Sequence, residues 1–267
     1  MKHGWGDCDA NNEKNIRTRS SIILETETTS LLIDMSPDLR QQLLKYGSSK
    51  IDGVIFTHEH YDHTCGINEL RPVFFGTDRS LEVYSRSEFL EPIKKMFYYL
   101  FASVTLDPFS VSSERYASTT CDIEADSARE SSVTSEIYKP YIVANTILDD
   151  FQIGDISGIC FEQDHGYSKS MGIRVGNFAY TTDVVSFPEE SFSKLYGLDT
   201  WIVGCLAPEK KSNHAGLDTV LKWVEMLEPK MTYLTHMSIH MDYDHLLTIL
   251  PSNVRPAYDQ MQLEVNI

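Results

Sequence analysis

The segment Thr57–His63 carries the residues with the clearest chemical potential in this chain of 267 residues. It reads THEHYDH and directly follows the apolar run Val54-Ile55-Phe56. Its imidazoles and the Asp62 carboxylate are side chains that bind Zn²⁺, Mn²⁺ or iron. With nine histidines in the chain, the pattern His-x-His-x-Asp-His would arise by chance on the order of once in a thousand such sequences. We therefore predict a metal site rather than a histidine-rich surface turn.

The spacing within this segment indicates that one loop serves two metal ions. His58 and His60 alternate at the end of a predicted strand, so both side chains can point the same way. Asp62 and His63 follow where the chain turns towards a helix, and they can face a second point nearby. Two divalent ions need about seven or eight ligand contacts of this kind, with positions left open for water and substrate. Further ligands must therefore come from elsewhere in the chain.

Three candidates for these ligands follow predicted strands. They are His165, after Ile156–Gln163; Asp183, after Ile173–Thr181; and His236, after Met231–Thr235. Active-site groups of sheet proteins collect at such positions. Taken singly, each signal is weaker. A lone histidine after a strand is more often an ordinary polar residue, and Asp183 alone could cap a helix ahead of Pro188.

The elements that would position these residues begin as strands and continue as strands alternating with helices. Further strands are predicted at Ser20–Thr26, Ser30–Asp34, Ile51–Phe56, Leu81–Tyr84 and Thr200–Cys205. Helices are predicted from Ser36-Pro37 to Tyr46 and at Gly66–Leu70, Ser87–Phe101, Pro188–Tyr196, Leu217–Leu227 and Asp242–Leu250. This order favours an α/β (α+β) fold in which helices cover the outer faces of sheets.

The length fits a single domain over residues 1–267, since α/β domains run to roughly 250 residues. A segment at about 107–136 differs in character, with eight serines between Ser110 and Ser135 and more acidic than basic residues. We interpret it as a surface insertion, either without a role of its own or acting as a lid or an oligomerisation arm. The apolar helix predicted beside it, Ser87–Phe101, makes a homodimer plausible.

The composition indicates the cellular compartment and the class of binding partner. The five cysteines are scattered and form no CxxC pair, which is typical of reduced cytoplasmic thiols. The N-terminus lacks the apolar region of a signal peptide, and no apolar run approaches the roughly 18 residues of a membrane span. The formal net charge of −16 counts against a nucleic-acid partner, because such binding requires Lys and Arg to neutralise phosphates.

Taken together, the residues singled out above resemble the ligand set of the metallo-β-lactamase superfamily. The segments Lys14–Ser21 and Asn213–Val220 are similar to the branch of PhnP-like cyclic phosphodiesterases. The resemblance covers nearly the whole chain apart from the serine-rich segment. It implies a four-layer αββα sandwich with the site at one edge of the two sheets.

The resemblance also implies a role for each site residue. One ion would be held by His58, His60 and His165, and the second by Asp62, His63 and His236. Asp183 would bridge the two. His214 matches a histidine that is not a ligand in this branch and that donates a proton or a hydrogen bond to the phosphoryl or leaving oxygen.

The chain departs from the family pattern in two places. Family members usually begin with a glycine-rich strand and loop, and here that first strand is missing or shortened. The branch also carries a structural zinc on several N-terminal cysteines, of which only Cys8 is present, so we expect no such zinc. His240 and His245 match no ligand of the motif, and we interpret both as surface residues.

These residues favour a metal-dependent hydrolase, in particular a phosphodiesterase acting on small, cyclic phosphodiesters. Two divalent ions, Zn²⁺ or Mn²⁺ ahead of iron, would leave the site positive despite Asp62 and Asp183, and so attract a small anion. They would lower the pKa of a bridging water towards about 7, and the resulting hydroxide, oriented by Asp62, would attack phosphorus. His214 would assist departure of the alkoxide.

Two alternatives stay open at this point. A ribonuclease Z-like RNA endonuclease would use the same ligands, although the acidic composition counts against it. A metal-stabilised binding protein with little catalysis is the other alternative. The number of ligands counts against it, because a structural metal site is normally closed and needs only four.

Overall fold

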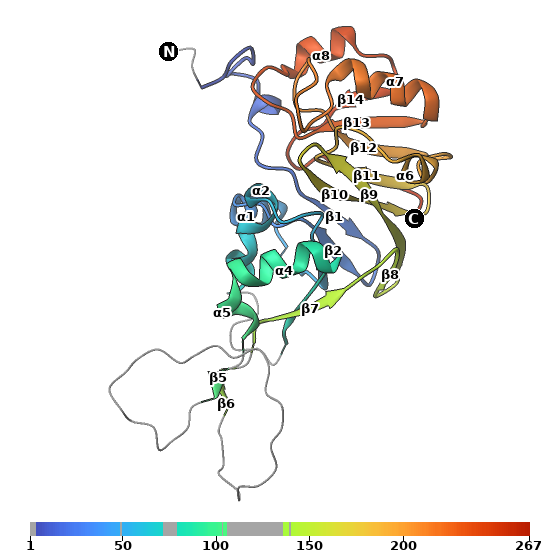
Figure 1. The fold of residues 1–267 in the computed structure, drawn as a ribbon. Helices are drawn as coiled ribbons and strands as arrows, with labels where there is room; N and C mark the ends of the chain where they lie inside the picture. Colours follow the sequence, from blue (N-terminus) through green and yellow to red (C-terminus); the bar gives the residue numbers. More distant parts are fainter. Residues whose placement is uncertain (1–3, 49, 72–78, 103, 106–135, 139) are drawn as a thin grey trace, which may run out of the picture.

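The computed structural model describes residues 4–48, 50–71, 79–102, 104–105, 136–138 and 140–267. Two sheets lie against each other in this part of the chain, and helices cover the outer face of each (Figure 1). None of the described helices is long and apolar enough to cross a membrane. The insertion predicted at about 107–136 lies outside the described residues except for its last position.

The first sheet has the strand order β1-β2-β3-β4-β7. Its strands are β1 (Ile22–Glu25), β2 (Ser30–Ile33), β3 (Gly53–Ile55), β4 (Leu81–Ser85) and β7 (Ile142–Thr146). β1 and β2 form an antiparallel hairpin, and the remaining neighbours are parallel. A separate pair consists of β5 (Val104–Thr105) and β6 (Glu136–Tyr138).

The second sheet has the order β14-β13-β12-β11-β10-β9-β8. Its strands are β8 (Asp150–Ile153), β9 (Ile156–His165), β10 (Ser168–Val175), β11 (Phe178–Thr181), β12 (Thr200–Gly204), β13 (Met231–Thr235) and β14 (Val254–Pro256). From β8 to β11 the neighbours are antiparallel, and from β11 to β14 they are parallel. The parallel strands end at the same edge, which is where Asp183 and His236 follow.

Helices pack on the outer face of each sheet (Figure 1). Beside the first sheet lie α1 (Leu39–Tyr46), α2 (Tyr61–Thr64), α4 (Ser87–Met96), α5 (Tyr98–Phe101) and the 3₁₀ turn η2 (Cys65–Leu70). Beside the second lie α6 (Glu189–Ser193), α7 (Leu217–Leu227) and α8 (Tyr243–Ile249). A further 3₁₀ turn, η1 (Glu13–Asn15), lies in the N-terminal segment.

Three apolar cores separate the layers. Successive residues of β2 show the arrangement, since Leu31 and Ile33 join the core between the sheets while Leu32 joins the core beneath α1 and α4. In the second sheet, Trp201 packs under α7 and Ile202 faces the other sheet. Because side chains alternate across a strand, each sheet has two buried faces. Three cores between four layers confirm the predicted αββα sandwich.

Several predicted boundaries were wrong. The strand predicted at Ile173–Thr181 is two strands, β10 and β11, joined by a turn at Gly176, whose φ of 54° is in the left-handed region. The helix predicted over Ser87–Phe101 breaks at Phe97 into α4 and α5. α1 begins at Leu39 rather than at Pro37. β7, β8 and β14 were not predicted.

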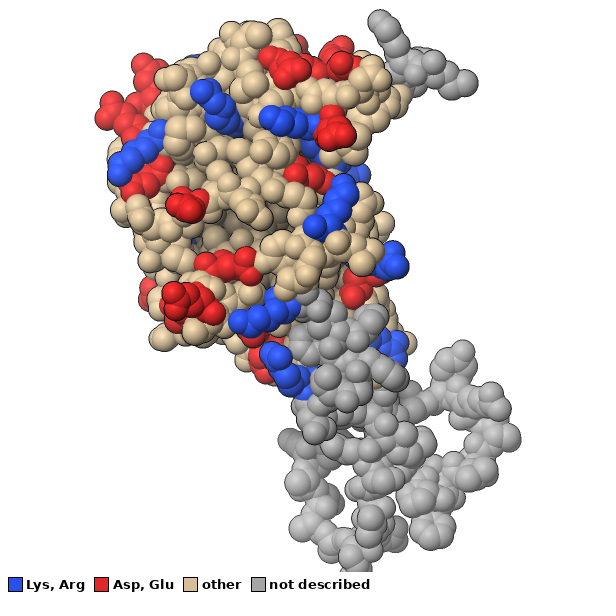
Figure 2. Space-filling model, turned by 180° about the vertical axis from the view of Figure 1, so that it is seen from behind, with Lys and Arg blue, Asp and Glu red and all other residues tan. Residues whose placement is uncertain are grey.

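A groove of about 1670 Å³ follows the edge of the first sheet at β1. Residues 17–26 and 257–267 are among those that line it. In the latter segment Leu263 and Val265 are half-buried while Glu264 is exposed, the alternation of a strand, although no strand forms there. The face in Figure 2 is hollowed in its middle, with few charged side chains inside the hollow. The first strand usual in the family, which we expected to be missing or shortened here, has no counterpart among the described residues.

Candidate metal centre

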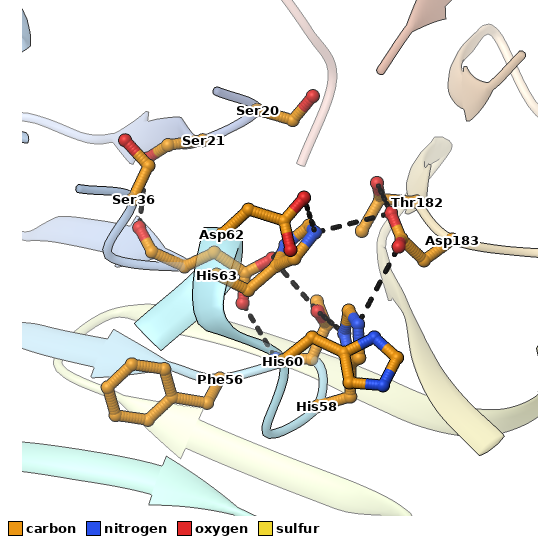
Figure 3. A network of polar contacts seen from close by, with 12 residues as sticks. Ser20, Ser21, Ser36, Phe56, His58, His60, Asp62, His63, Thr182 and Asp183 are labelled. Atoms are coloured by element: carbon orange, nitrogen blue, oxygen red, sulfur yellow. Dashed lines mark hydrogen bonds and ion pairs between the residues drawn. The ribbon is translucent and has the colours of Figure 1, made fainter. Parts of the chain in front are cut away.

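The predicted ligands meet where strands of both sheets end. His58 and His60 follow β3, and Asp62 and His63 lie on or beside the short helix α2. In the second sheet, His165 is the last residue of β9. The sequence had predicted that this strand ends at Gln163 and that His165 follows it. Asp183 and His236 follow β11 and β13. Figure 3 shows His58, His60, Asp62 and His63 gathered beside Asp183.

One group of possible ligands consists of His58, His60, His165 and Asp183. Its four ligand atoms lie within 4.8 Å of one another. His165 Nε2 lies 3.3 Å from His60 Nδ1 and 3.5 Å from Asp183 Oδ2, and His58 Nε2 lies 3.6 Å from the same oxygen. The atoms therefore converge on one point, as the ligands of a single ion must.

A second group consists of Asp62, His63 and His236. His236 Nε2 lies 3.2 Å from Asp62 Oδ2, and His63 Nε2 lies 3.8 Å from it. Both nitrogens also approach the other carboxylate oxygen of Asp183, at 3.2 and 3.3 Å. Asp183 thus presents Oδ2 to the first group and Oδ1 to the second.

The Asp183 carboxylate is held firmly between the two groups. Thr182 Oγ1 donates to Asp183 Oδ1 at 2.8 Å, and Ser170 Oγ donates to the Asp183 backbone carbonyl. Burial alone would raise the pKa of Asp183, but His236, His63 and His58 hold it well below its ordinary value. The group is therefore a fixed anion at neutral pH.

Hydrogen bonds to the opposite ring nitrogen orient three of the histidines. His63 Nδ1 donates to Asp34 Oδ2 at 2.7 Å, and His165 Nδ1 donates to the Asn213 carbonyl at 2.7 Å. Thr57 Oγ1 donates to Asp34, so it accepts from His58 Nδ1 at 3.0 Å. In the neutral ring each bond places the proton on Nδ1, so that the Nε2 lone pair faces the site, as ligation requires.

The described residues fit divalent metal ions by a direct test. His58 Nε2 and His63 Nε2 are buried and make no hydrogen bond within the described part of the chain, although Asp183 lies within 3.3 to 3.6 Å of both. A buried polar atom without a partner is costly, and a metal ion would satisfy both nitrogens. The donor atoms are imidazole nitrogens and carboxylate oxygens, without sulfur.

Asp34 also belongs to the site, and it was not predicted from the sequence. Its side chain is fully buried, and it accepts from Thr57 N and Thr57 Oγ1 as well as from His63. The carboxylates of Asp183 and Asp34 raise the pKa of His63 well above its ordinary value, against the effect of burial. The available signal was its position, since Asp34 follows β2 as Asp183 and His236 follow their strands.

These three strand-end residues share a strained backbone. Asp34, Asp183 and His236 have φ values of 64°, 49° and 55°. Non-glycine residues seldom adopt this left-handed region, which costs of order 1–3 kcal/mol each and is commonest at functional sites. All three residues belong to the centre, Asp34 through its hydrogen bond with His63 and the other two as possible ligands.

His214 lies near Asp183 Oδ2 but belongs to neither of the two ligand groups described above. Its Nε2 is 3.9 Å from Asp183 Oδ2, and it forms a third possible group with Asp183 and His236. Burial lowers the pKa of His214 to about 4, so the ring is neutral at pH 7. A neutral ring can donate one hydrogen bond, which favours that role over transfer of a full proton.

His240, His245 and Cys8 lie apart from the centre. His240 and His245 are exposed, as predicted, and His240 Nδ1 bonds to Asp7. Cys8 is buried beside Arg17, whose Nη2 donates to its sulfur, and no group of possible metal ligands among the described residues includes it. Arg17 also donates to the carbonyls of Ser238 and Met241. The N-terminal segment is thereby fastened to the loop that follows His236.

Comparison with known proteins agrees with this geometry. A curated octanoyltransferase of Porphyromonas gingivalis is 26% identical over 259 residues, which is 96% of this chain and 46% of that protein. The chain thus spans about half the length of that relative. A solved structure of a new diphosphatase from the PhnP family is 25% identical, with a TM-score of 0.78 over 95% of this chain and 86% of that chain.

More distant structures share the fold. The short form of human tRNase Z is 15% identical, with a TM-score of 0.63 over 93% of each chain. The family model that describes a β-lactamase superfamily domain matches residues 29–237, which include every predicted metal ligand. The chain therefore belongs to the metallo-β-lactamase superfamily, and within it is similar to the PhnP-like hydrolases.

Proposed function

We propose that the chain is a phosphodiesterase that cleaves small phosphodiesters, cyclic ones in particular, with two divalent ions. The observation that carries the proposal is the Asp183 carboxylate, which turns one oxygen to His58 and His165 and the other to His63 and His236. A carboxylate shared in this way suits two ions a few Å apart, an arrangement common in phosphoester hydrolysis. The similarity to a PhnP-family diphosphatase supports phosphorus chemistry.

The ions, for which the donor set favours Zn²⁺ or Mn²⁺ ahead of iron, would stabilise charge on the phosphoryl oxygens and lower the pKa of a water between them. Asp62 is suited to orient that water. Burial would raise the pKa of Asp62, but the hydrogen bond from His236 and the charge of His63 lower it, so the carboxylate stays ionised and accepts a hydrogen bond.

His214 supplies the complementary contact. Its ring lies 4.9 Å from that of His165 and 5.1 Å from that of His236, centroid to centroid, so it stands at the boundary of the two groups. From there its N–H can bond to the phosphoryl or leaving oxygen. Such positioned hydrogen bonds and proton transfers typically contribute a factor of about 10²–10⁴ in rate.

RNA is the second candidate substrate, which corresponds to the alternative of a ribonuclease Z-like endonuclease. The structural likeness to human tRNase Z concerns the fold, and the net charge of −16 opposes a long polyanion. The relative named octanoyltransferase is about twice as long as this chain. Acyl transfer is therefore an activity to include in the assays rather than the leading proposal.

One assay series separates these activities. Protein loaded with Zn²⁺ or Mn²⁺ is offered bis(p-nitrophenyl) phosphate, a 2′,3′-cyclic nucleotide, a pre-tRNA and an octanoyl thioester, with His240→Ala as a control outside the centre. We expect turnover of the first two. Cleavage of the pre-tRNA alone, or of the thioester alone, would replace the proposal. Binding of metal without turnover of any substrate would favour a metal-stabilised binding protein.

A further inference from the structure

We propose that Tyr167 stacks on the base of a nucleotide-type substrate, so that the preferred phosphodiesters carry a nucleobase. This inference rests on the proposed function and narrows its substrate class. The observation behind it is an exposed aromatic ring beside the buried ligand set. Tyr167 is 79% exposed, yet its ring centroid lies 6.4 Å from those of both His60 and His165.

The backbone holds Tyr167 in a fixed position. It occupies the two-residue turn Gly166-Tyr167 between β9 and β10, in which Ser168 pairs with His165. Gly166 has a φ of 77°, and a Cβ at this position would lie 2.6 Å from the Ser212 carbonyl oxygen. The turn therefore packs closely against the loop that carries His214. The backbone of Tyr167 therefore has a defined place beside the centre.

Packing and turn chemistry do not explain an aromatic residue there. The turn requires glycine at its first position, whereas its second position accepts many residues. Tyr167 takes part in none of the three apolar cores. An isolated exposed tyrosine is common on protein surfaces, but this one lies over His60 and His165, on the group that would hold one ion. Its free face is therefore available to whatever projects from a phosphoryl group at the centre.

A flat, uncharged heterocycle suits that face best. Stacking of a base on an aromatic ring is tolerant of base identity and is worth enough to matter at a single contact. Tyr61, the first residue of α2 and the neighbour of His60 in the chain, is also exposed, at 65%.

The test compares substrates with and without a base. For Tyr167→Leu, kcat/KM for 2′,3′-cyclic AMP should fall about tenfold, the size of one base–aromatic stack, while kcat/KM for glycerol 1,2-cyclic phosphate should change less than about twofold. Tyr167→Phe keeps the ring and should retain both values. Tyr196→Leu, at an exposed tyrosine after α6, is the matched control and should change neither.

Equal losses on both substrates, no loss on either, or a comparable loss in Tyr167→Phe would overturn the inference. If no phosphodiester is cleaved, the proposed function fails, and stacking is then judged by binding alone. In that case metal-loaded protein should bind AMP about tenfold more tightly than ribose 5-phosphate, measured by calorimetry, and Tyr167→Leu should remove the difference. Equal affinities in the unsubstituted protein would reject the stacking role independently.

Discussion

Asp34 Oδ2 lies 2.7 Å from Nδ1 of His63, and both side chains are fully buried. A carboxylate behind a metal-binding histidine fixes the ring and increases its basicity, and loss of such a partner typically weakens metal binding 10- to 100-fold. We therefore expect Asp34→Asn to lower the metal affinity of the second group by that factor while the chain still folds. Competition with a chelator of known affinity measures it.

The control for this change is Asp244→Asn. Asp244 is exposed and accepts a hydrogen bond from Asn12 far from the centre. The metal affinity of the Asp244→Asn variant should therefore equal that of the unsubstituted protein. Circular dichroism of both variants establishes that the fold persists. Unchanged affinity in folded Asp34→Asn would mean that His63 does not ligate through Nε2.

Asp34 also shows what the sequence could and could not reveal. Periodicity predicted α7 and β13 to the residue, because their apolar patterns are long or sharply bounded. Motif spacing indicated the four ligand candidates of the Thr57–His63 segment, positions after predicted strands indicated the other three, and the family resemblance indicated His214. The fold places all eight together. Asp34 lies outside that motif, and its one signal in the sequence is its position after a strand. Its importance comes from a contact with His63, 29 residues away, that forms only when β2 and β3 pair.

The misplaced elements have similar causes. β10 and β11 were merged because Gly176-Asn177 interrupts a continuous apolar run by only two residues, too little to separate a turn from a bulge. β8 alternates buried and exposed residues over only four positions, and its pairing with β9 creates the strand. Such short elements depend on tertiary partners more than on their own sequence.

Removal of Asp183 should affect both ions, whereas removal of Asp62 should affect one. Asp183 faces both groups, whereas the ion pairs of Asp62 within the described part of the chain are with His63 and His236, both of the second group. In protein purified without added metal and then loaded with Zn²⁺, Asp62→Ala should retain about one ion and Asp183→Ala fewer still, by elemental analysis. Two ions in Asp183→Ala would refute a bridging role.

His214→Gln should lose turnover and keep its metals. The ring reaches Asp183 only at 3.9 Å, and its neutral form suits hydrogen bonding to substrate. We expect kcat to fall by about 10²–10⁴, with metal content equal to that of the unsubstituted protein. Loss of an ion on this substitution would instead identify His214 as a ligand, in the third group that it forms with Asp183 and His236.

Metal removal should destabilise the whole fold. The centre joins strands of both sheets, and without ions the Nε2 atoms of His58 and His63 stay buried without a hydrogen bond. An ion present at one hundred times its Kd adds about 2.7 kcal/mol to the free energy of unfolding. Chelation should therefore lower Tm by several degrees, and re-addition of Zn²⁺ or Mn²⁺ should restore it. A Tm insensitive to chelator would show that the ions are not bound.

The metal-free protein should lose stability as the pH falls from about 6.5 to 4, partly because of His214. Burial lowers the pKa of this group from 6.5 to about 4, so between these values the unfolded chain binds a proton that the folded chain does not. At pH 5 the loss is about 2 kcal/mol relative to pH 7. His63, whose pKa is raised, acts in the opposite direction, but it is unchanged in the variant His214→Gln and so contributes equally to both proteins. His214→Gln lacks the first contribution, so its urea-derived free energy of unfolding should fall by about that much less over the same range. Parallel pH profiles for the two proteins would show that His214 is not held neutral by the fold.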